Sequence, residues 1–475
     1  MKRIFIYYFF LISFFTNAQQ KFILDDFIKR SVNSIENKKV KKNKEIIQNE
    51  NSLFKKSFLP NVSLNFALPS YNRSISDVLQ PDGTFAFRES NSANSRVSLS
   101  LSQKLPFTGG EISISNSFNR LDIFGDTQNS TSYSASWFGA SLSQPLNFFN
   151  EMKWDKKIQE TNLEYSEIVY KKSLVGIKKE SINHFFELLK IKNEKKILNY
   201  EVSKALEYKK IIISLINAGK NMAYDSIDIE LKLLNKKKIF KFLEKSEKMK
   251  LKSINTFFNS KLINIKDSLQ LPIIEFEIKY LQFYIDKYLN IYPIIEKNRL
   301  WGLEKNIVKL KKNQFYSANL SVGVGFNNST DNFDNIFLSP NQSQNFSISL
   351  NVPLLDFGRK RLELTNAKFK YEIELLNLDQ EKLLSIERIS FLYEEINDLF
   401  TSLKIEESRI ELLKLKFKRV ESLLYAQRVL LKDFSDIENL LYDSLTEKLD
   451  LIHSIYKKAL EIEEITLFNI VDNEN

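Results

Sequence analysis

The chain has 475 residues, of which 43% are hydrophobic, which is enough to build cores and excludes disorder throughout. Its 11 glycines and 9 prolines are few for this length, so we expect long regular elements rather than the loop-rich fold of an α/β enzyme. The net charge of +10 is a modest excess. The lysines lie among Glu and Asn on helical patterns without the aromatic interleaving of a nucleic-acid groove, so we expect them on solvated helix faces.

Side chains that carry chemistry are rare. The sequence has no cysteine and two histidines, His184 and His453, which excludes thiol catalysis, disulfides and cysteine-based zinc sites. Both histidines lie in helical patterns beside apolar neighbours, where a structural role is the ordinary one. We therefore expect no enzyme activity, no cofactor, no metal site and no nucleic-acid partner.

Residues 1–18 have the pattern of a secretory signal peptide. Lys2 and Arg3 precede an apolar run over residues 4–15, and a small-residue site ends at Ala18. The run is shorter than the roughly 20 apolar residues of a membrane-spanning helix, although a buried first helix or an anchor is the alternative. We expect export and cleavage after Ala18. No later segment has 18 uninterrupted apolar residues, so strands would be the remaining way to cross a membrane.

One helix and a strand region follow the signal peptide. The charged pattern of residues 19–57 predicts an N-terminal helix, which Pro60 ends. Residues 58–146 are rich in Ser, Asn and aromatic side chains, and their period-2 alternation predicts strands. The four predicted strands are 61–71, 95–105, 111–122 and 132–146.

The connections between these strands alternate in length. Residues 72–94 and 123–131 are long or polar, whereas residues 106–110 form a tight turn. Long loops on one side and short turns on the other are typical of outer-membrane barrels.

Residues 147–315 predict a long helical hairpin. Apolar residues spaced by 3 and 4 run from residue 151 to 216 without a proline, and the helix breaks at Asn217-Ala218-Gly219. A second helix runs from about Ala223 into the 260s. Pro272 interrupts it, and another helical stretch leads through Pro293 to about Phe315.

The second half repeats this order. Residues 316–355 predict two strands, 317–327 and 344–355, and residues 356–475 predict a second helical hairpin and a C-terminal helix, whose first helix runs from Arg359 to Leu431. In that helix a heptad stripe, which predicts coiled-coil packing, is broken by Glu406 alone. The stripe consists of Leu392, Ile396, Leu399, Leu403, Ile410, Leu413, Phe417, Val420 and Leu424.

The two halves indicate an internal duplication. Residues 58–64 correspond to 316–322, and residues 145–150 correspond to 353–358. The offsets are 258 and 208, so the first copy carries 50 extra residues, the size of one strand hairpin. We place the extra hairpin at residues 95–122.

The duplicated pattern and the junction Val352–Gly358, followed by a basic helix start, resemble the TolC family of outer-membrane efflux and secretion channels. Asn217-Ala218-Gly219, with Asp225 six residues on, resembles the first hairpin tip of that family. The second tip, residues 425–436, lacks the family's glycine, and the chain lacks the cysteine of lipid-modified members.

The resemblance implies an α+β membrane protein, namely a trimeric β-barrel continuous with a long coiled-coil α-helical barrel in the periplasm. Each protomer would contribute 4 to 6 strands, giving 12 or 18 in the barrel, unless the extra hairpin folds over the outer mouth. The implied function is an outer-membrane exit duct of a tripartite efflux pump or type I secretion system. Its partners would be two further copies, a periplasmic adaptor protein, an inner-membrane transporter reached through the adaptor, and outer-membrane lipid. The alternatives are a passive porin and a periplasmic coiled-coil scaffold.

Two sets of candidate residues lie at the hairpin tips. Rings of Asp433 and Asp436, held by Lys432 or Arg428, would form a cation-attracting periplasmic gate, and helix capping by surface acids is the alternative. The candidate contacts for the adaptor are Asn217, Gly219, Lys220, Asp225, Phe434 and Ser435, although Gly219 and Asp225 are equally suited to ending one helix and capping the next.

The remaining candidates lie where strands meet helices. The junction residues are Pro145, Phe149, Pro353, Leu354, Asp356, Phe357 and Gly358. Aromatic girdles at the membrane boundary, with interprotomer packing as the alternative, are expected from Phe107, Trp137, Phe138, Phe148 and Phe149. Cations at a helix start oppose its dipole, so we expect contact with peptidoglycan or phospholipid headgroups at Arg359, Lys360 and Arg361.

Overall fold

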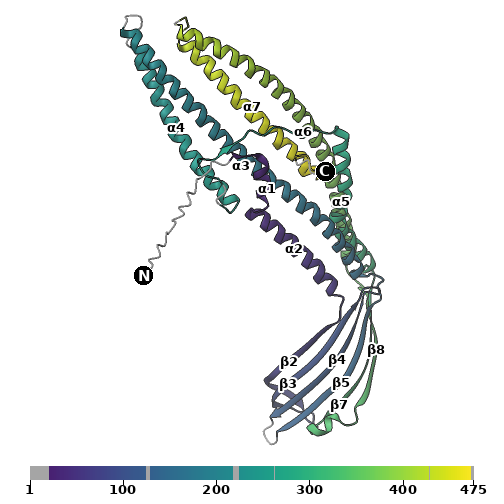
Figure 1. The fold of residues 1–475 in the computed structure, drawn as a ribbon. Coiled ribbons are helices and arrows are strands. Elements are labelled where there is room, and N and C mark those ends of the chain that lie inside the picture. The colour runs from purple at the N-terminus through teal and green to yellow at the C-terminus, as the bar shows by residue number, and fades with distance from the viewer. Residues whose placement is uncertain are drawn as a thin grey trace, which may run out of the picture. The chain divides into compact units, whose positions relative to one another are not determined.

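A computed structural model describes residues 21–124, 129–217, 224–260, 263–426, 428–429 and 431–471, and the statements below concern these residues (Figure 1). The expected signal peptide lies outside them. The chain divides into two compact units. The first comprises residues 1–43, 168–291 and 384–475, and the second comprises residues 44–167 and 292–383. Both units therefore draw on both halves of the duplicated sequence.

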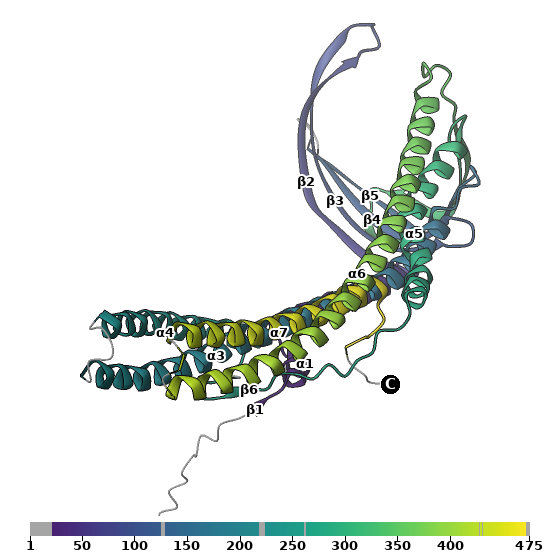
Figure 2. The same ribbon diagram turned by 90° about the horizontal axis from the view of Figure 1, so that it is seen from above.

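The second unit contains one antiparallel sheet of six strands in the order β2-β3-β4-β5-β7-β8 (Figure 1). β5 pairs with β7, so the two halves of the chain share a single sheet. Figure 2 shows the strong curvature of β2 and β3. The strands are β2 (Asn61–Leu79), β3 (Phe85–Leu105), β4 (Gly110–Phe124), β5 (Ser130–Pro145), β7 (Ser317–Thr330) and β8 (Asn341–Asn351).

The first hairpin is much longer than the sequence predicts. Residues 72–94, expected as a connection, extend β2 and β3 and leave a turn over residues 80–84. The turn closes where Asp82 Oδ1 accepts the Thr84 amide at 3.0 Å and Gly83 adopts a φ of 82°, which favours glycine. The prediction was wrong because Ser, Asn and charged residues outnumber the apolar residues here, so the apolar alternation is weak. β8 instead ends early, at Asn351 rather than residue 355.

The extra hairpin, β3 and β4, belongs to this sheet. β3 pairs with β2 on one side and with β4 on the other, from Asn91–Phe124 to Leu105–Gly110. The alternative in which it folds over the mouth of a barrel is therefore wrong. The sheet therefore has six strands, and β2 and β8 are its open edges.

The first unit is helical. Its core includes the ring of Phe27, which lies 5.1 Å from that of Phe185 and 5.6 Å from that of Phe258, edge to face in both cases. Lys178 and Glu463 form a buried ion pair of 3.2 Å in the same unit. The helices and short strands that lie wholly within it are β1 (Lys21–Phe22), α1 (Leu24–Ser31), α4 (Tyr224–Phe257), β6 (Ser268–Leu269) and α7 (Leu431–Thr466).

Four helices have residues in both units: α2 (Ile35–Lys56), α3 (Glu151–Asn217), α5 (Leu281–Lys312) and α6 (Arg359–Tyr425). In the second unit, Lys305 Nζ lies 3.0 Å from Glu151 and 2.6 Å from Asp155, which joins α5 to α3. Arg299 likewise joins α5 to α6 through Glu374 and Glu381. In the described part of the chain no helix is long and apolar enough to span a membrane.

The predicted long helices are confirmed with small changes. α3 ends at Asn217 as expected, and α5 continues through Pro293. α6 ends at Tyr425 rather than Leu431. The single N-terminal helix expected over 19–57 is instead β1, α1 and α2, because the Ser34 Oγ accepts the Asn37 amide at 3.1 Å and so caps a new helix.

Candidate functional site: tips, junction and sheet faces

The hairpins α3–α4 and α6–α7 pack against each other near their tips. Phe434, fully buried, lies with its ring 5.2 Å from that of Tyr208 on α3 and 5.2 Å from that of Phe417 on α6. Ile229 and Leu233 of α4 complete this core. The prediction that Phe434 contacts an adaptor protein is therefore wrong, since a fully buried ring offers no surface to a partner. Its role is to hold the two hairpins together.

The structure describes some of the other expected docking residues. Asn217 is exposed at the end of α3. Ser435 is half-buried, and its Oγ accepts a hydrogen bond from Lys232 Nζ. Gly219 and Lys220 lie outside the described residues. For Asp225 only the backbone, in the first turn of α4, is described.

The candidate gate acids are exposed. Asp433 and Asp436 lie in the first turns of α7, and Lys432 and Arg428 are exposed beside them. Within the described ranges, no ion pair joins either acid to Lys432 or Arg428. Asp433 lies in the first turn, where a carboxylate also interacts favourably with the helix dipole. The geometry of one chain suits both the gate and the capping role.

A buried acid that the sequence analysis missed lies one turn beyond Phe434. Glu438 is 3% exposed, and its Oε1 has no hydrogen-bond partner in the described part of the chain. Burial, with a smaller contribution from Glu201, raises the pKa of Glu438 to about 7, against the opposing charges of Lys236, Lys232 and Lys204. The sequence feature that could have revealed Glu438 is a carboxylate within the apolar stripe of α7.

The two junctions between strand and helix share one local structure. Asn147 Oδ1 accepts the Phe149 amide at 3.3 Å, and Asp356 Oδ1 accepts the Gly358 amide at 3.0 Å. The residue inside each turn is a phenylalanine in the left-handed region: Phe148 with a φ of 55° and Phe357 with a φ of 50°. The structural offset is therefore 209, one more than the sequence match indicated.

These junctions expose large apolar side chains. Phe148 is 85% exposed and Phe357 is 89% exposed, and Leu354 is more exposed still, as is Phe107 in the turn between β3 and β4. Phe149, by contrast, is buried, so its assignment to a girdle is wrong. Pro145 and Pro353 are half-buried, and Pro145 ends β5.

The basic start of α6 is satisfied within the chain. Asp356 Oδ2 accepts the Lys360 amide at 3.2 Å, which offsets the cationic side chains at this helix N-terminus. Lys360 Nζ donates to the Asn313 carbonyl at 2.9 Å, and Arg359 pairs with Glu363 at 2.9 Å. A headgroup contact is thus not needed to explain Arg359 and Lys360. Arg361 is exposed.

The sheet has one apolar and one polar face. Leu64 lies opposite Leu99, and Leu101 opposite Ile114, on what we call the apolar face; it continues over β7 and β8. The other face, the serine face, carries hydroxyl pairs such as Ser63–Ser100 at 2.8 Å. Leu64 is 54% exposed, although its face is apolar. A contiguous apolar surface of this kind marks contact with a partner or a membrane.

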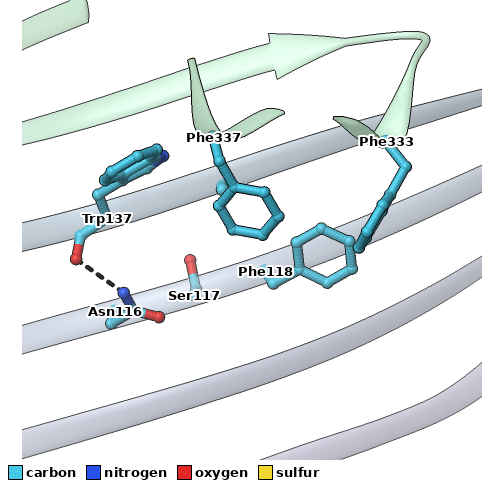
Figure 3. A pocket seen from close by; sticks show the side chains of 7 residues that line it. Asn116, Ser117, Phe118, Trp137, Phe333 and Phe337 are labelled. Atoms are coloured by element: carbon cyan, nitrogen blue, oxygen red, sulfur yellow. Dashed lines mark hydrogen bonds between the residues drawn. The ribbon is translucent and has the colours of Figure 1, made fainter. Parts of the chain in front are cut away.

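Aromatic rings gather on the apolar face beyond its aliphatic part (Figure 3). Trp137, one of the predicted girdle residues, lies 5.9 Å from the ring of Phe337 in the connection between β7 and β8. Phe118 lies 5.8 Å from Phe333 of the same connection, which contains the 3-10 helix η1 (Phe333–Phe337). Phe138 lies opposite Phe326 of β7. On β4 and β7, aliphatic side chains of this face are thus followed by an aromatic one.

Comparison with solved structures finds this fold among outer-membrane channel proteins. The crystal structure of the outer membrane protein VceC from Vibrio cholerae has a TM-score of 0.65 at 11% identity, covering 93% of this chain and 95% of that one. The CmeC outer membrane channel of Campylobacter jejuni has a TM-score of 0.65 at 11% identity, covering 95% and 87%. The open state of the MtrE outer membrane channel of Neisseria gonorrhoeae has a TM-score of 0.61 at 12% identity, covering 93% and 88%.

No protein-family model matches the sequence, and no curated protein matches it either. The structural matches to VceC and CmeC nevertheless cover more than nine tenths of the chain. The chain has the fold of the outer-membrane factor channels, which confirms, for the fold, the resemblance to the TolC family.

Proposed function

We propose that the protein is an outer-membrane channel that acts as the passive exit duct of a tripartite efflux pump or a type I secretion system. The observation that carries this proposal is the two-faced sheet, which exposes an apolar face and lines its opposite face with serine. In a membrane barrel the apolar face contacts lipid and the polar face lines water. Long helices follow each of the two groups of strands, β2–β5 and β7–β8, and these helices would form the periplasmic part of the channel.

We propose a homotrimer with one shared barrel. The open edges β2 and β8 expose unpaired backbone groups, which a neighbouring copy would satisfy. Six strands from each of three copies give 18, a number that in porins leaves an aqueous channel. Exposed apolar side chains on the helices also need partners, for example Leu231 of α4 at 60% and Leu412 of α6 at 68% exposure.

We further propose that the tips serve as gate and docking site. Three copies of Asp433 and Asp436 around one axis would form acidic rings that attract cations and repel anions. An adaptor protein would contact the exposed residues beside the tips, including Asn217, while Phe434 holds the hairpins from inside. The inner-membrane transporter would be reached through the adaptor.

Channel recording tests the duct. The purified protein reconstituted in planar bilayers should give discrete conductance steps with cation preference. A porin would give the same steps without any dependence on the helices, so deleting the helical hairpin tips should leave its conductance unchanged, whereas the duct should open further. A periplasmic scaffold would give no conductance and would be found outside the membrane fraction.

A further inference from the structure

The rings on the apolar face line an open pocket of 340 Å³, here called the cavity, which lies between β4, β5 and the connection that contains η1 (Figure 3). Phe118 and Ala135 form its floor, and Trp137, Phe333 and Phe337 form its walls. The cavity is at the lower end of the size range of small-molecule pockets, and its lining is mostly apolar. It would admit a slender apolar group rather than a bulky one.

Hydrogen bonds hold the walls in place. Asn328 Nδ2 lies 2.8 Å from the Leu338 carbonyl and 3.0 Å from the Asn335 carbonyl, so one side chain of β7 fixes the C-terminal half of η1. The Trp137 indole donates to the Ile336 carbonyl at 3.2 Å. The connection is therefore folded back onto the apolar face by specific bonds, and the cavity is a built feature of the sheet.

The cavity lies at a boundary along β4. Ile112 and Ile114 precede it on the apolar face, and Arg120 and Asp122 follow it, joined by an ion pair of 2.9 Å. The Arg120 guanidinium also lies 6.0 Å from the centre of the Tyr133 ring. Along one strand, an aliphatic surface thus leads into an aromatic cavity and then to charged groups, which is the order of tail, interface and headgroup in a lipid layer.

We propose that this cavity holds one acyl chain of a membrane phospholipid whose headgroup lies toward Arg120 and Asp122. The proposal rests on the proposed function, because it requires the apolar face to contact lipid. Continuity between the cavity and the exposed aliphatic surface favours a chain that enters from the bilayer. A soluble aromatic compound would need polar groups to fix its orientation, and beyond Asn116 and Ser117 the lining residues offer only rings and Ala135.

Fluorescence quenching tests the site. The chain has three tryptophans, so Trp154→Phe with Trp301→Phe leaves Trp137 as the sole probe within the cavity wall. In detergent micelles, lysophosphatidylcholine with a dibrominated acyl chain should quench Trp137 in a saturable manner at about one probe per chain. Non-specific contact gives quenching in proportion to the mole fraction of probe in the micelle. Quenching of that kind without a saturable part would overturn the proposal.

Two variants separate binding from general exposure. Ala135→Leu adds three carbon atoms to the floor of the cavity and should weaken the affinity of the saturable binding at least tenfold. Phe337→Ala should open a wall that is 53% exposed and weaken that affinity to a similar extent. Phe346→Ala is the matched control, because Phe346 is exposed on the same face but does not line the cavity. Unchanged saturation in both cavity variants contradicts the site.

The membrane placement is checked separately in vesicles. Trp137 should be quenched by phosphatidylcholine brominated in its acyl chains whether or not the cavity is filled. If Ala135→Leu and the parent are both quenched there but neither shows saturation in micelles, the acyl-chain site falls and the channel proposal stands. If neither is quenched in vesicles, the apolar face does not contact lipid and both proposals fall.

Discussion

Phe148 and Phe357 occupy equivalent positions in the two strand-to-helix junctions, after β5 and after β8, each left-handed and each almost fully exposed. A left-handed phenylalanine costs roughly 1 kcal/mol or more in backbone strain, and exposure of its ring to water adds no compensating contact. An Asx oxygen two residues from the bonded amide holds both turns. The same costly arrangement occurs at both junctions of the chain.

Substitution of adjacent phenylalanines should therefore have opposite effects. Phe148→Asn should leave the free energy of unfolding in detergent unchanged or raised by about 1 kcal/mol, because asparagine tolerates the left-handed region. Phe149→Ala should lose about 3 kcal/mol, because Phe149 is buried. Thermal unfolding measures both. A comparable loss in the two variants would show that Phe148 packs within the protein.

The two faces of β4 should differ in their tolerance of charge. Ile114→Arg places a cation on the apolar face, and should cost about 2–4 kcal/mol in a lipid bilayer. Ser115→Arg places the same charge one residue on, on the serine face, and should be tolerated. The folded fraction in vesicles, measured by resistance to dissociation in detergent without heating, compares them. Equal tolerance would contradict the assignment of the faces.

Removal of the acidic pair tests the gate. Asp433→Asn with Asp436→Asn should reduce the preference for cations over anions in single-channel recordings, because the field at the constriction loses six charges in a trimer. The matched control is Asp443→Asn, an exposed acid farther along the same helix. If the double variant keeps the selectivity of the parent, these acids are surface and capping residues.

Glu438 should make the tip sensitive to pH. Its pKa is about 7 in the folded protein, above the unfolded value near 4.5, so the stability it contributes is present at low pH and is lost as the pH rises through 7. The loss between pH 5 and 8 should reach up to about 3 kcal/mol.

The change Glu438→Gln isolates this effect. Glutamine resembles the protonated acid, so the variant should melt at a higher temperature than the parent at pH 8 and show no difference at pH 4. Glu447→Gln, at an exposed site of the same helix, should melt as the parent does at both values. Stability of the parent that rises with pH over this range would show that Glu438 is paired as a carboxylate.

The helices were predictable because their apolar residues repeat at spacings of 3 and 4 for many turns. In the heptad stripe of α6, Leu392, Ile396, Leu403 and Ile410 are buried, whereas its other members are half-buried, so the predicted coiled-coil packing stays a prediction. The strands were harder. Between residues 72 and 94 a few apolar residues such as Ile75, Phe85 and Phe87 lie among Ser, Asn and charged residues, so the alternation is weak there. The pairing between β2 and β3 defines the strands.

The sites were predictable in position but less so in detail. An aromatic residue at a helical tip, such as Phe434, has the same sequence signature whether it faces a partner or another hairpin, and α3, which buries it, is more than 200 residues away. Glu438 was missed because the burial that raises its pKa, and the smaller effect of Glu201, depend on packing against helices that are distant in the sequence. The structural equivalence of Phe148 and Phe357 depends on turn geometry. The sequence match did not reveal it, because its offset of 208 differs by one residue from the structural offset of 209.

Imaging of the detergent-purified protein by single-particle electron microscopy tests the central claim most directly. We predict particles with threefold symmetry, in which an 18-stranded barrel continues into a helical tube that narrows at its far end. A monomeric particle, or a barrel closed by a single chain with its helices outside the conduit, would contradict the account of a shared exit duct.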